Sequence, residues 1–161
     1  MFNKIKPSLI VERIDNLDID KLIFMGIEGL VIDIDNTITH HDQLNCESWA
    51  SNFIALAKQK GMKICLVSNN NLKRVNPICS QLNVVAVSDA GKPSKHAYQK
   101  ALALISVKAE HAVAIGDQLF TDILGGNRAG LFTVLVTPIS PKEALRIKIF
   151  RPVEKVFRLF L

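Results

Sequence analysis

Five short segments of this chain consist almost entirely of aliphatic and β-branched residues, without alternation between apolar and polar positions. A strand exposed on one face alternates, whereas a strand buried on both faces reads as a continuous apolar run. The five segments therefore predict the strands of a buried, mainly parallel sheet. They are Gly29–Asp35, Lys63–Ser68, Val84–Val87, Ala112–Gly116 and Phe132–Thr137.

Segments with helical spacing lie between these runs. Glu47–Lys60 and Ser94–Ile105 each place apolar residues on one stripe, and we expect a helix over Asn71–Leu82 as well. This alternation predicts an α/β fold, with a doubly wound, five-stranded, Rossmann-like sheet covered by helices on both faces. A chain of 161 residues is expected to fold as one domain spanning residues 1–161. Its apolar fraction of 48% excludes a disordered chain.

The net charge of +5 is unevenly distributed, because residues 141–161 alone carry a net charge of +4. This segment has the pattern of a basic amphipathic helix, which would either dock on the domain or lie at an anionic membrane surface. The three cysteines have neither disulfide nor metal-site spacing, and no apolar run is long enough to span a membrane. The N-terminus also lacks the apolar core of a secretory signal, so we expect a cytoplasmic protein.

Polar and acidic residues follow four of the five apolar runs, at the sheet edge where α/β proteins bind ligands. Asp33 and Asp35 alternate with the period of a strand, so we expect both carboxylates to point to the same side. Two close carboxylates repel each other, which either separates their proton affinities or recruits a cation, and Asp117 would complete an oxygen cage for Mg2+. Acids, a hydroxyl and a lysine together meet the needs of phosphoryl transfer. A purely structural acid cluster is the alternative. The residues concerned are Asp33, Asp35, Thr37, Ser68, Asn69, Lys92, Asp117 and Asp122.

These motifs resemble the four ordered motifs of the haloacid dehalogenase (HAD) superfamily. The matching residues are Asp33-Ile-Asp-Asn-Thr37, Ser68, Lys92-Pro93 and Gly116-Asp-Gln-Leu-Phe-Thr-Asp122. The similarity is closer to the short YqeG-type phosphatases, which share Val67-Ser-Asn-Asn70, Arg74-Val75 and the segment Gly125–Pro138. It spans nearly the whole chain.

The resemblance implies a phosphatase in which Asp33 is the nucleophile and Asp35 is the general acid and base. It also implies that Mg2+ is held by Asp33, by the main-chain carbonyl of Asp35 and by Asp117. The presence of Asp35 favours phosphate chemistry, because dehalogenases of the superfamily lack this second acid.

The same resemblance assigns the remaining polar residues to the phosphoryl group. Ser68 and Lys92 would bind it, together with Asn69 and Thr37, and Thr37 would also anchor the loop that carries Asp35. Lys92 would offset the negative charge of Asp33 and of the transferring group. Asp122 would orient Lys92 or support the metal.

The spacing between motifs leaves no room for the cap domain that larger relatives insert. An open site suits a phosphate carried on something large, and family members that act on phosphatidylglycerophosphate make this lipid the best substrate hypothesis. A phosphatase of another macromolecule or metabolite and a non-catalytic basic binding module are the alternatives. The predicted sheet lacks interleaved basic and aromatic residues, so we expect no nucleic-acid binding. Both a monomer and a homo-oligomer are compatible with the sequence.

Two other features have two interpretations each. His40 and His41 belong to a solvated loop or, as the alternative, to a second metal site. The turn at Gly125 and Gly126 serves tight packing or phosphate binding, and Arg128 is its member to test.

Overall fold

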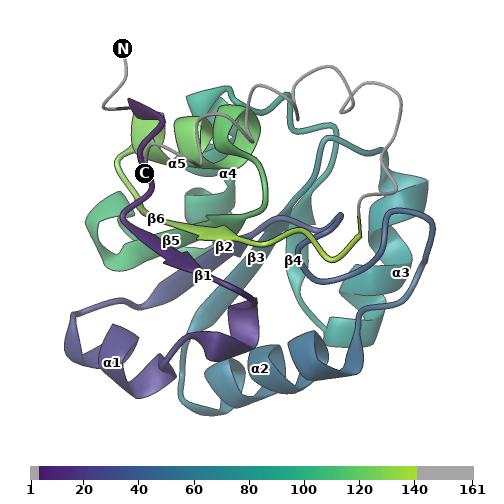
Figure 1. Ribbon diagram of the computed structural model, residues 1–161, viewed down its shortest axis with the longest axis horizontal. Helices are drawn as coiled ribbons and strands as arrows, with labels where there is room; N and C mark the ends of the chain where they lie inside the picture. The colour runs from purple at the N-terminus through teal and green to yellow at the C-terminus, as the bar shows by residue number, and fades with distance from the viewer. Residues whose placement is uncertain (1–3, 141–161) are drawn as a thin grey trace.

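The computed structural model describes residues 4–140, whose centre is a six-stranded sheet. The strand order is β1-β6-β5-β2-β3-β4, and every neighbouring pair is parallel. β2 and β5 lie side by side at the centre of the sheet, where its two halves meet (Figure 1). The strands are β1 (Leu9–Val11), β2 (Gly29–Ile32), β3 (Lys63–Val67), β4 (Val85–Val87), β5 (Ala112–Gly116) and β6 (Phe132–Val136).

The five predicted strands are all present, so the doubly wound α/β class is confirmed, but the expectation of only five strands was wrong. The additional strand, β1, pairs with β6, with Leu9 opposite Val134. It is three residues long and lies at the sheet edge, where Leu9 and Ile10 are 40% and 48% exposed. A short, partly exposed edge strand lacks the long apolar run that indicates burial on both faces.

Helices cover both faces of the sheet (Figure 1). Along β2, Leu30 and Ile32 belong to one core, which also holds buried residues of α1, α2 and α3, whereas Val31 belongs to a second core with residues of α4. This division follows from the alternation of side chains along a strand. The helices are α1 (Ile19–Phe24), α2 (Ser48–Gln59), α3 (Leu72–Leu82), α4 (Lys95–Ile105) and α5 (Leu124–Ala129), and α2, α3 and α4 match the three predicted helical segments.

The loop between β2 and α2 is a compact turn. Asn36 has a φ of 63°, and its backbone N–H donates to the carbonyl of Thr39 at 2.8 Å. Ile34 and Ile38 are fully buried and fix this turn to the core. The loop therefore holds the residues after β2 in defined positions at the carboxyl end of the sheet.

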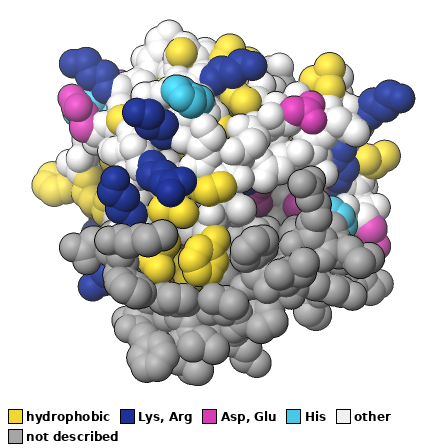
Figure 2. Space-filling view, turned by 90° about the horizontal axis from the view of Figure 1, so that it is seen from above, with side chains coloured by type: hydrophobic (Ala, Val, Ile, Leu, Met, Phe, Trp, Pro, Cys, Tyr) yellow, Lys and Arg dark blue, Asp and Glu magenta, His cyan; other side chains and the backbone are white. Residues whose placement is uncertain are grey.

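Among residues 4–140, no helix is long and apolar enough to cross a membrane. The predicted basic segment, residues 141–161, lies outside the described residues, so its docking or membrane contact stays a prediction. Lys and Arg side chains of the described part are spread over the face shown in Figure 2, among uncharged and apolar residues.

Candidate active site

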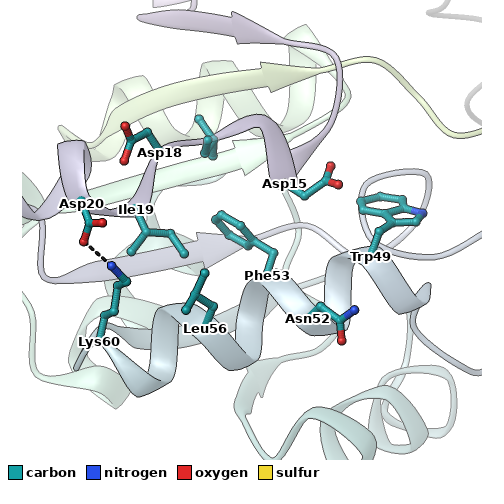
Figure 3. Close-up of a pocket in the computed structure, with 10 residues that line it drawn as sticks. Asp15, Asp18, Ile19, Asp20, Trp49, Asn52, Phe53, Leu56 and Lys60 are labelled. Carbon is teal, nitrogen blue, oxygen red and sulfur yellow. Dashed lines mark hydrogen bonds and ion pairs between the residues drawn. The ribbon is translucent and has the colours of Figure 1, made fainter.

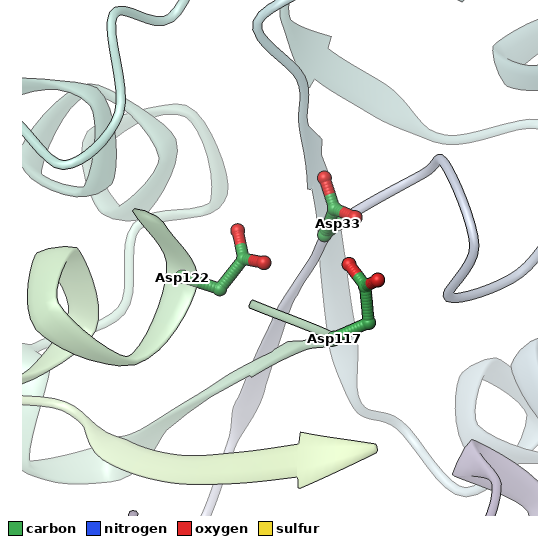
Figure 4. A group of neighbouring side chains, drawn as sticks. All are labelled: Asp33, Asp117 and Asp122. Carbon is green, nitrogen blue, oxygen red and sulfur yellow. The ribbon is translucent and has the colours of Figure 1, made fainter. Parts of the chain in front are cut away.

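Three buried carboxylates converge at the carboxyl ends of β2 and β5. Asp33 follows β2 directly, and its backbone N–H donates to the carbonyl of Ile115 in β5 at 2.9 Å. Asp117 follows β5, and Asp122 comes from the turn beyond it. One carboxylate oxygen of each lies within 4.8 Å of the others (Figure 4). Pairing of neighbouring parallel strands thus brings together acids that are far apart in the sequence.

The position of Asp122 depends on an unusually wide helical turn. Residues Leu119–Ile123 form a π-helical turn, a rare geometry that is frequent at functional sites. The Asp122 Oδ2 atom accepts a hydrogen bond from the Gln118 backbone N–H at 3.1 Å, and the Tyr98 hydroxyl donates to the Asp122 carbonyl at 3.2 Å. Both the side chain and the main chain of Asp122 are therefore held in place.

Lys92 links the acids through its buried ammonium group. Its Nζ donates to Asp33 Oδ1 at 2.5 Å, to Asp122 Oδ1 at 2.7 Å and to the Val67 carbonyl at 3.1 Å. Burial alone would lower the pKa of Lys92, but the carboxylates of Asp122 and Asp33 outweigh burial and raise this pKa well above its usual value. The side chain is consequently a fixed positive charge between two acids.

Asp33 occupies the centre of the site. Its Oδ1 accepts from Lys92, and its Oδ2 accepts from the Thr37 hydroxyl at 3.2 Å. Burial raises the pKa of Asp33 well above its ordinary value, Lys92 opposes this shift, and the charges of Asp122 and Asp117 add to it. Both oxygens of the carboxylate are thus held by hydrogen bonds, and burial disfavours its charged form.

The residues after β3 arrange the loop around Lys92. Asn69 Oδ1 accepts from the Lys92 backbone N–H at 2.7 Å, and the Asn69 amide donates back to the Lys92 carbonyl at 3.4 Å. Ser68 is buried, and its hydroxyl accepts from the Asn70 backbone N–H at 3.1 Å. The amide of Asn69 is thereby engaged with the backbone that presents Lys92.

The carboxylate of Asp35 lies apart from the group formed by the other three acids. Its Oδ2 accepts from the Asn70 amide at 2.6 Å, and its Oδ1 accepts from Arg74 Nη2 at 2.8 Å. His41 Nδ1 is 3.5 Å from the same Oδ1. Because β2 ends at Ile32, strand alternation does not govern where Asp35 points, and Asp122 takes the third position in the carboxylate group.

Asn70 and Arg74 were not singled out as functional residues in the sequence, although both contact Asp35. Their spacing is the sequence signal, since they follow Ser68 by two and six residues. In the structure, the side chain of Asn71 caps α3 by accepting from the Arg74 backbone N–H at 3.2 Å, which places Arg74 in the first turn of the helix. A residue in the first turn of a helix that follows a strand end faces the ligand edge of the sheet.

The glycines near α5 have a packing role. A Cβ on Gly125 would lie 2.4 Å from the Tyr98 ring, and one on Gly126 would lie 2.7 Å from the Ala114 Cβ. Arg128 is exposed and donates to the Pro93 carbonyl at 3.3 Å. His40 Nε2 is 3.6 Å from Glu47. The absence of side chains at Gly125 and Gly126 thus lets α5 lie close to Tyr98 of α4 and to Ala114 of β5.

A groove of about 490 Å³ runs between residues 15–20 and α2. Figure 3 shows apolar side chains such as Phe53 and Leu56 in it, with Lys60 paired to Asp20 at one end. None of its lining residues belongs to the carboxylate group described above. The groove is therefore separate from the carboxylate group at the strand ends.

A doubly wound parallel sheet that presents a buried Asp–Lys–Asp group at its carboxyl edge is the arrangement of a HAD-type hydrolase. Residues 89–156 match the family model described as HAD-hydrolase-like. The chain is 34% identical over 149 residues, 92% of its length, to the Bacillus subtilis (strain 168) protein named "Probable phosphatase YqeG", of which the match covers 87%. The chain therefore belongs to the YqeG family and is a HAD-type phosphatase.

Two further similarities extend this result. The chain is 28% identical over 143 residues, 83% of its length, to a Chlamydomonas reinhardtii protein named "Phosphatidylglycerophosphate phosphatase 1, chloroplastic", and covers 53% of that protein. Among solved structures, the cobalt-bound deoxy-D-mannose-octulosonate 8-phosphate phosphatase YrbI of Haemophilus influenzae superimposes with a TM-score of 0.58 at 18% identity. That match covers 81% of this chain and 76% of the other, and it shows the shared fold.

Proposed function

We propose that this phosphatase hydrolyses phosphomonoesters through an aspartyl-phosphate on Asp33, that it uses Mg2+, and that phosphatidylglycerophosphate is its substrate. The observation that carries the chemistry is the contact of one buried ammonium group, that of Lys92, with both Asp33 and Asp122, beside a third acid, Asp117.

The charges of the site fit a divalent cation. Three buried carboxylates face a single ammonium group, and uncompensated buried charges are strongly destabilising. Carboxylate oxygens are the ligands that Mg2+ prefers. Asp33 and Asp117 would hold the ion, with the main-chain carbonyl of Asp35. When bound, Mg2+ supplies neutralisation of charge on the phosphoryl oxygens.

In the first step, a carboxylate oxygen of Asp33 attacks the phosphorus of the ester. The bond between Asp33 and phosphorus forms, the bond from phosphorus to the ester oxygen breaks, and Asp35 gives its proton to the departing oxygen. Thr37 and Lys92 restrain rotation of the Asp33 carboxylate, which favours this attack because both of its oxygens are held.

In the second step, Asp35 takes a proton from water, and the resulting hydroxide attacks the phosphorus. The bond between phosphorus and Asp33 breaks, so that inorganic phosphate leaves and the carboxylate is restored. Ser68 and Lys92 stabilise the phosphoryl oxygens in both steps. Asn69 contributes by holding the Lys92 backbone, and Asp122 contributes by orienting the Lys92 ammonium group.

The substrate proposal rests on two observations. The similarity to the Chlamydomonas protein covers 83% of the chain. The segments between motifs also contain only the loop, α2 and β3 on one side and α3 and β4 on the other, so no cap domain is inserted between Thr37 and Lys92. An uncapped site accepts a phosphate carried on a lipid, and we place the protein in the cytoplasm, where it would act on the inner face of the membrane.

The experiment is a turnover assay with vesicles that contain phosphatidylglycerophosphate, run beside soluble phosphomonoesters. Wild-type protein with Mg2+ is expected to release phosphate from the lipid, whereas EDTA and the variant Asp33→Asn abolish release. Turnover by Asp33→Asn would overturn the covalent mechanism. Efficient cleavage of soluble esters with none of the lipid would overturn the substrate and leave the mechanism standing.

A further inference from the structure

Arg74, at the start of α3, has hydrogen-bond donors that no group within residues 4–140 uses. Its Nη2 donates to Asp35 Oδ1 at 2.8 Å and to the His40 carbonyl at 3.0 Å. Its Nε and Nη1 are buried and have no hydrogen-bond partner within residues 4–140. The side chain is 14% exposed, so the guanidinium lies mostly within the site.

His41 approaches the same place from the loop after β2. Its Nδ1 is buried without a hydrogen bond inside the described part of the chain, and it lies 3.5 Å from Asp35 Oδ1. Arg74 and His41 therefore come from two different elements and converge on one oxygen atom of Asp35. Together they place an imidazole and the two guanidinium nitrogens of Arg74 that lack a partner within residues 4–140 beside the acid that handles the ester oxygen.

Buried donors of a charged group that have no partner are costly, and native proteins keep few of them. Such a group calls for an explanation, and a ligand that completes its hydrogen bonds is one. A guanidinium pairs best with oxyanions such as phosphate, and an imidazole N–H can donate to the same group. The unused donors of Arg74, with the His41 ring beside the same carboxylate, therefore indicate a binding site for a phosphate-type anion.

The position of Asp35 defines which part of the substrate this anion belongs to. In the proposed function, Asp35 protonates the departing ester oxygen, so its neighbours lie on the leaving-group side of the scissile phosphate. An anion bound there is carried by the alcohol portion of the substrate and is distinct from the phosphoryl group that Asp33 and Lys92 hold.

We propose that Arg74 and His41 form a second anion subsite, which binds a phosphate-type group in the leaving-group portion of the substrate. This inference rests on the proposed function, because Asp35 assigns the side. In phosphatidylglycerophosphate the phosphodiester is such a group, separated from the terminal phosphate by one glycerol. The subsite selects substrates with two phosphates over simple monoesters.

Binding to the Asp33→Asn protein tests the subsite without turnover. Isothermal titration calorimetry with Mg2+ present compares deacylated phosphatidylglycerophosphate, which carries a phosphodiester and a monoester, with glycerol 3-phosphate, which carries the monoester alone. The first ligand is expected to bind at least about tenfold more tightly. Adding Arg74→Gln is expected to lower this ratio of affinities by about tenfold to hundredfold, the range of a charged hydrogen bond.

Matched variants make the result specific. Lys73→Gln removes the same charge from an exposed neighbour on α3 and is expected to leave the ratio of affinities unchanged. Arg74→Lys is expected to give a ratio between those of Arg74→Gln and the Arg74 protein. His41→Gln is expected to lower the ratio. If Arg74 only orients Asp35, Arg74→Gln changes both affinities equally and the ratio stays constant, which overturns the subsite. Failure of the proposed function is seen separately, as absence of turnover by wild-type protein.

Discussion

Gly116 and Asp122 are so close that a Cβ atom on Gly116 would lie 2.3 Å from the Asp122 Cγ atom. Only the absence of a side chain at the end of β5 lets the π-helical turn bring Asp122 to Lys92. The glycine in the fourth sequence motif is therefore part of the construction of the site, although it offers no functional group.

Gly116→Ala is expected to lower kcat by about hundredfold, because displacement of a positioned group by about 1 Å has this effect. Asp122 would move away, and the Lys92 ammonium group would lose one of its acceptors. Steady-state kinetics on a soluble phosphomonoester measures the loss. A melting temperature recorded for the same sample separates displacement from unfolding, and an active, stable Gly116→Ala variant would contradict this role of the glycine.

Lys92→Met is expected to destabilise the metal-free protein by about 3–5 kcal/mol, the effect of removing one member of a buried ion pair. Asp33 and Asp122 would then face each other without a cation inside the fold. Urea unfolding in EDTA measures the change. Lys73→Met is the control, since an exposed lysine on α3 is expected to change stability by less than about 0.5 kcal/mol.

The apolar runs were sufficient to predict the central sheet. Gly29–Ile32 is buried along its whole length, so its composition reflects burial on both faces, whereas the edge strand β1 carries no comparable signal. Acids such as Asp33 and Asp117 were predictable as neighbours because each directly follows a central strand.

Partners that depend on loop geometry were beyond the sequence. The position of Asp122 depends on a π-helical turn, and the separation of Asp35 from the other acids depends on a turn with a positive φ at Asn36. Neither turn is marked by a repeating pattern of residue types, so the sequence alone does not predict it. The pairing of Arg74 with Asp35 follows from both the turn and the start of α3, so only the structure shows it.

The thiols of Cys46 and Cys65 are expected to be unreactive in the folded protein, and that of Cys79 to react slowly. Burial raises the pKa of Cys46 and of Cys65 to about 12, and at pH 8 such a thiol is thiolate in only about one molecule in ten thousand. Burial also raises the pKa of Cys79, which is partly exposed. Ellman's reagent at pH 8 should therefore react with Cys79 first, and with all three thiols after unfolding in guanidinium. Rapid reaction of Cys65 in the native protein would contradict its placement in the core.

Mg2+ is expected to stabilise the folded protein through Asp117. A ligand that binds only the native state at one hundred times its Kd adds about 2.7 kcal/mol to the free energy of unfolding. Wild-type protein should gain this amount over a Mg2+ titration, whereas Asp117→Asn should gain much less, because it loses one carboxylate of the buried group. Asp42→Asn removes an exposed acid from the loop after β2 and should respond like wild type. Equal stabilisation of Asp117→Asn and wild type would exclude Asp117 as a ligand, because the gain depends on how tightly the native state holds the ion.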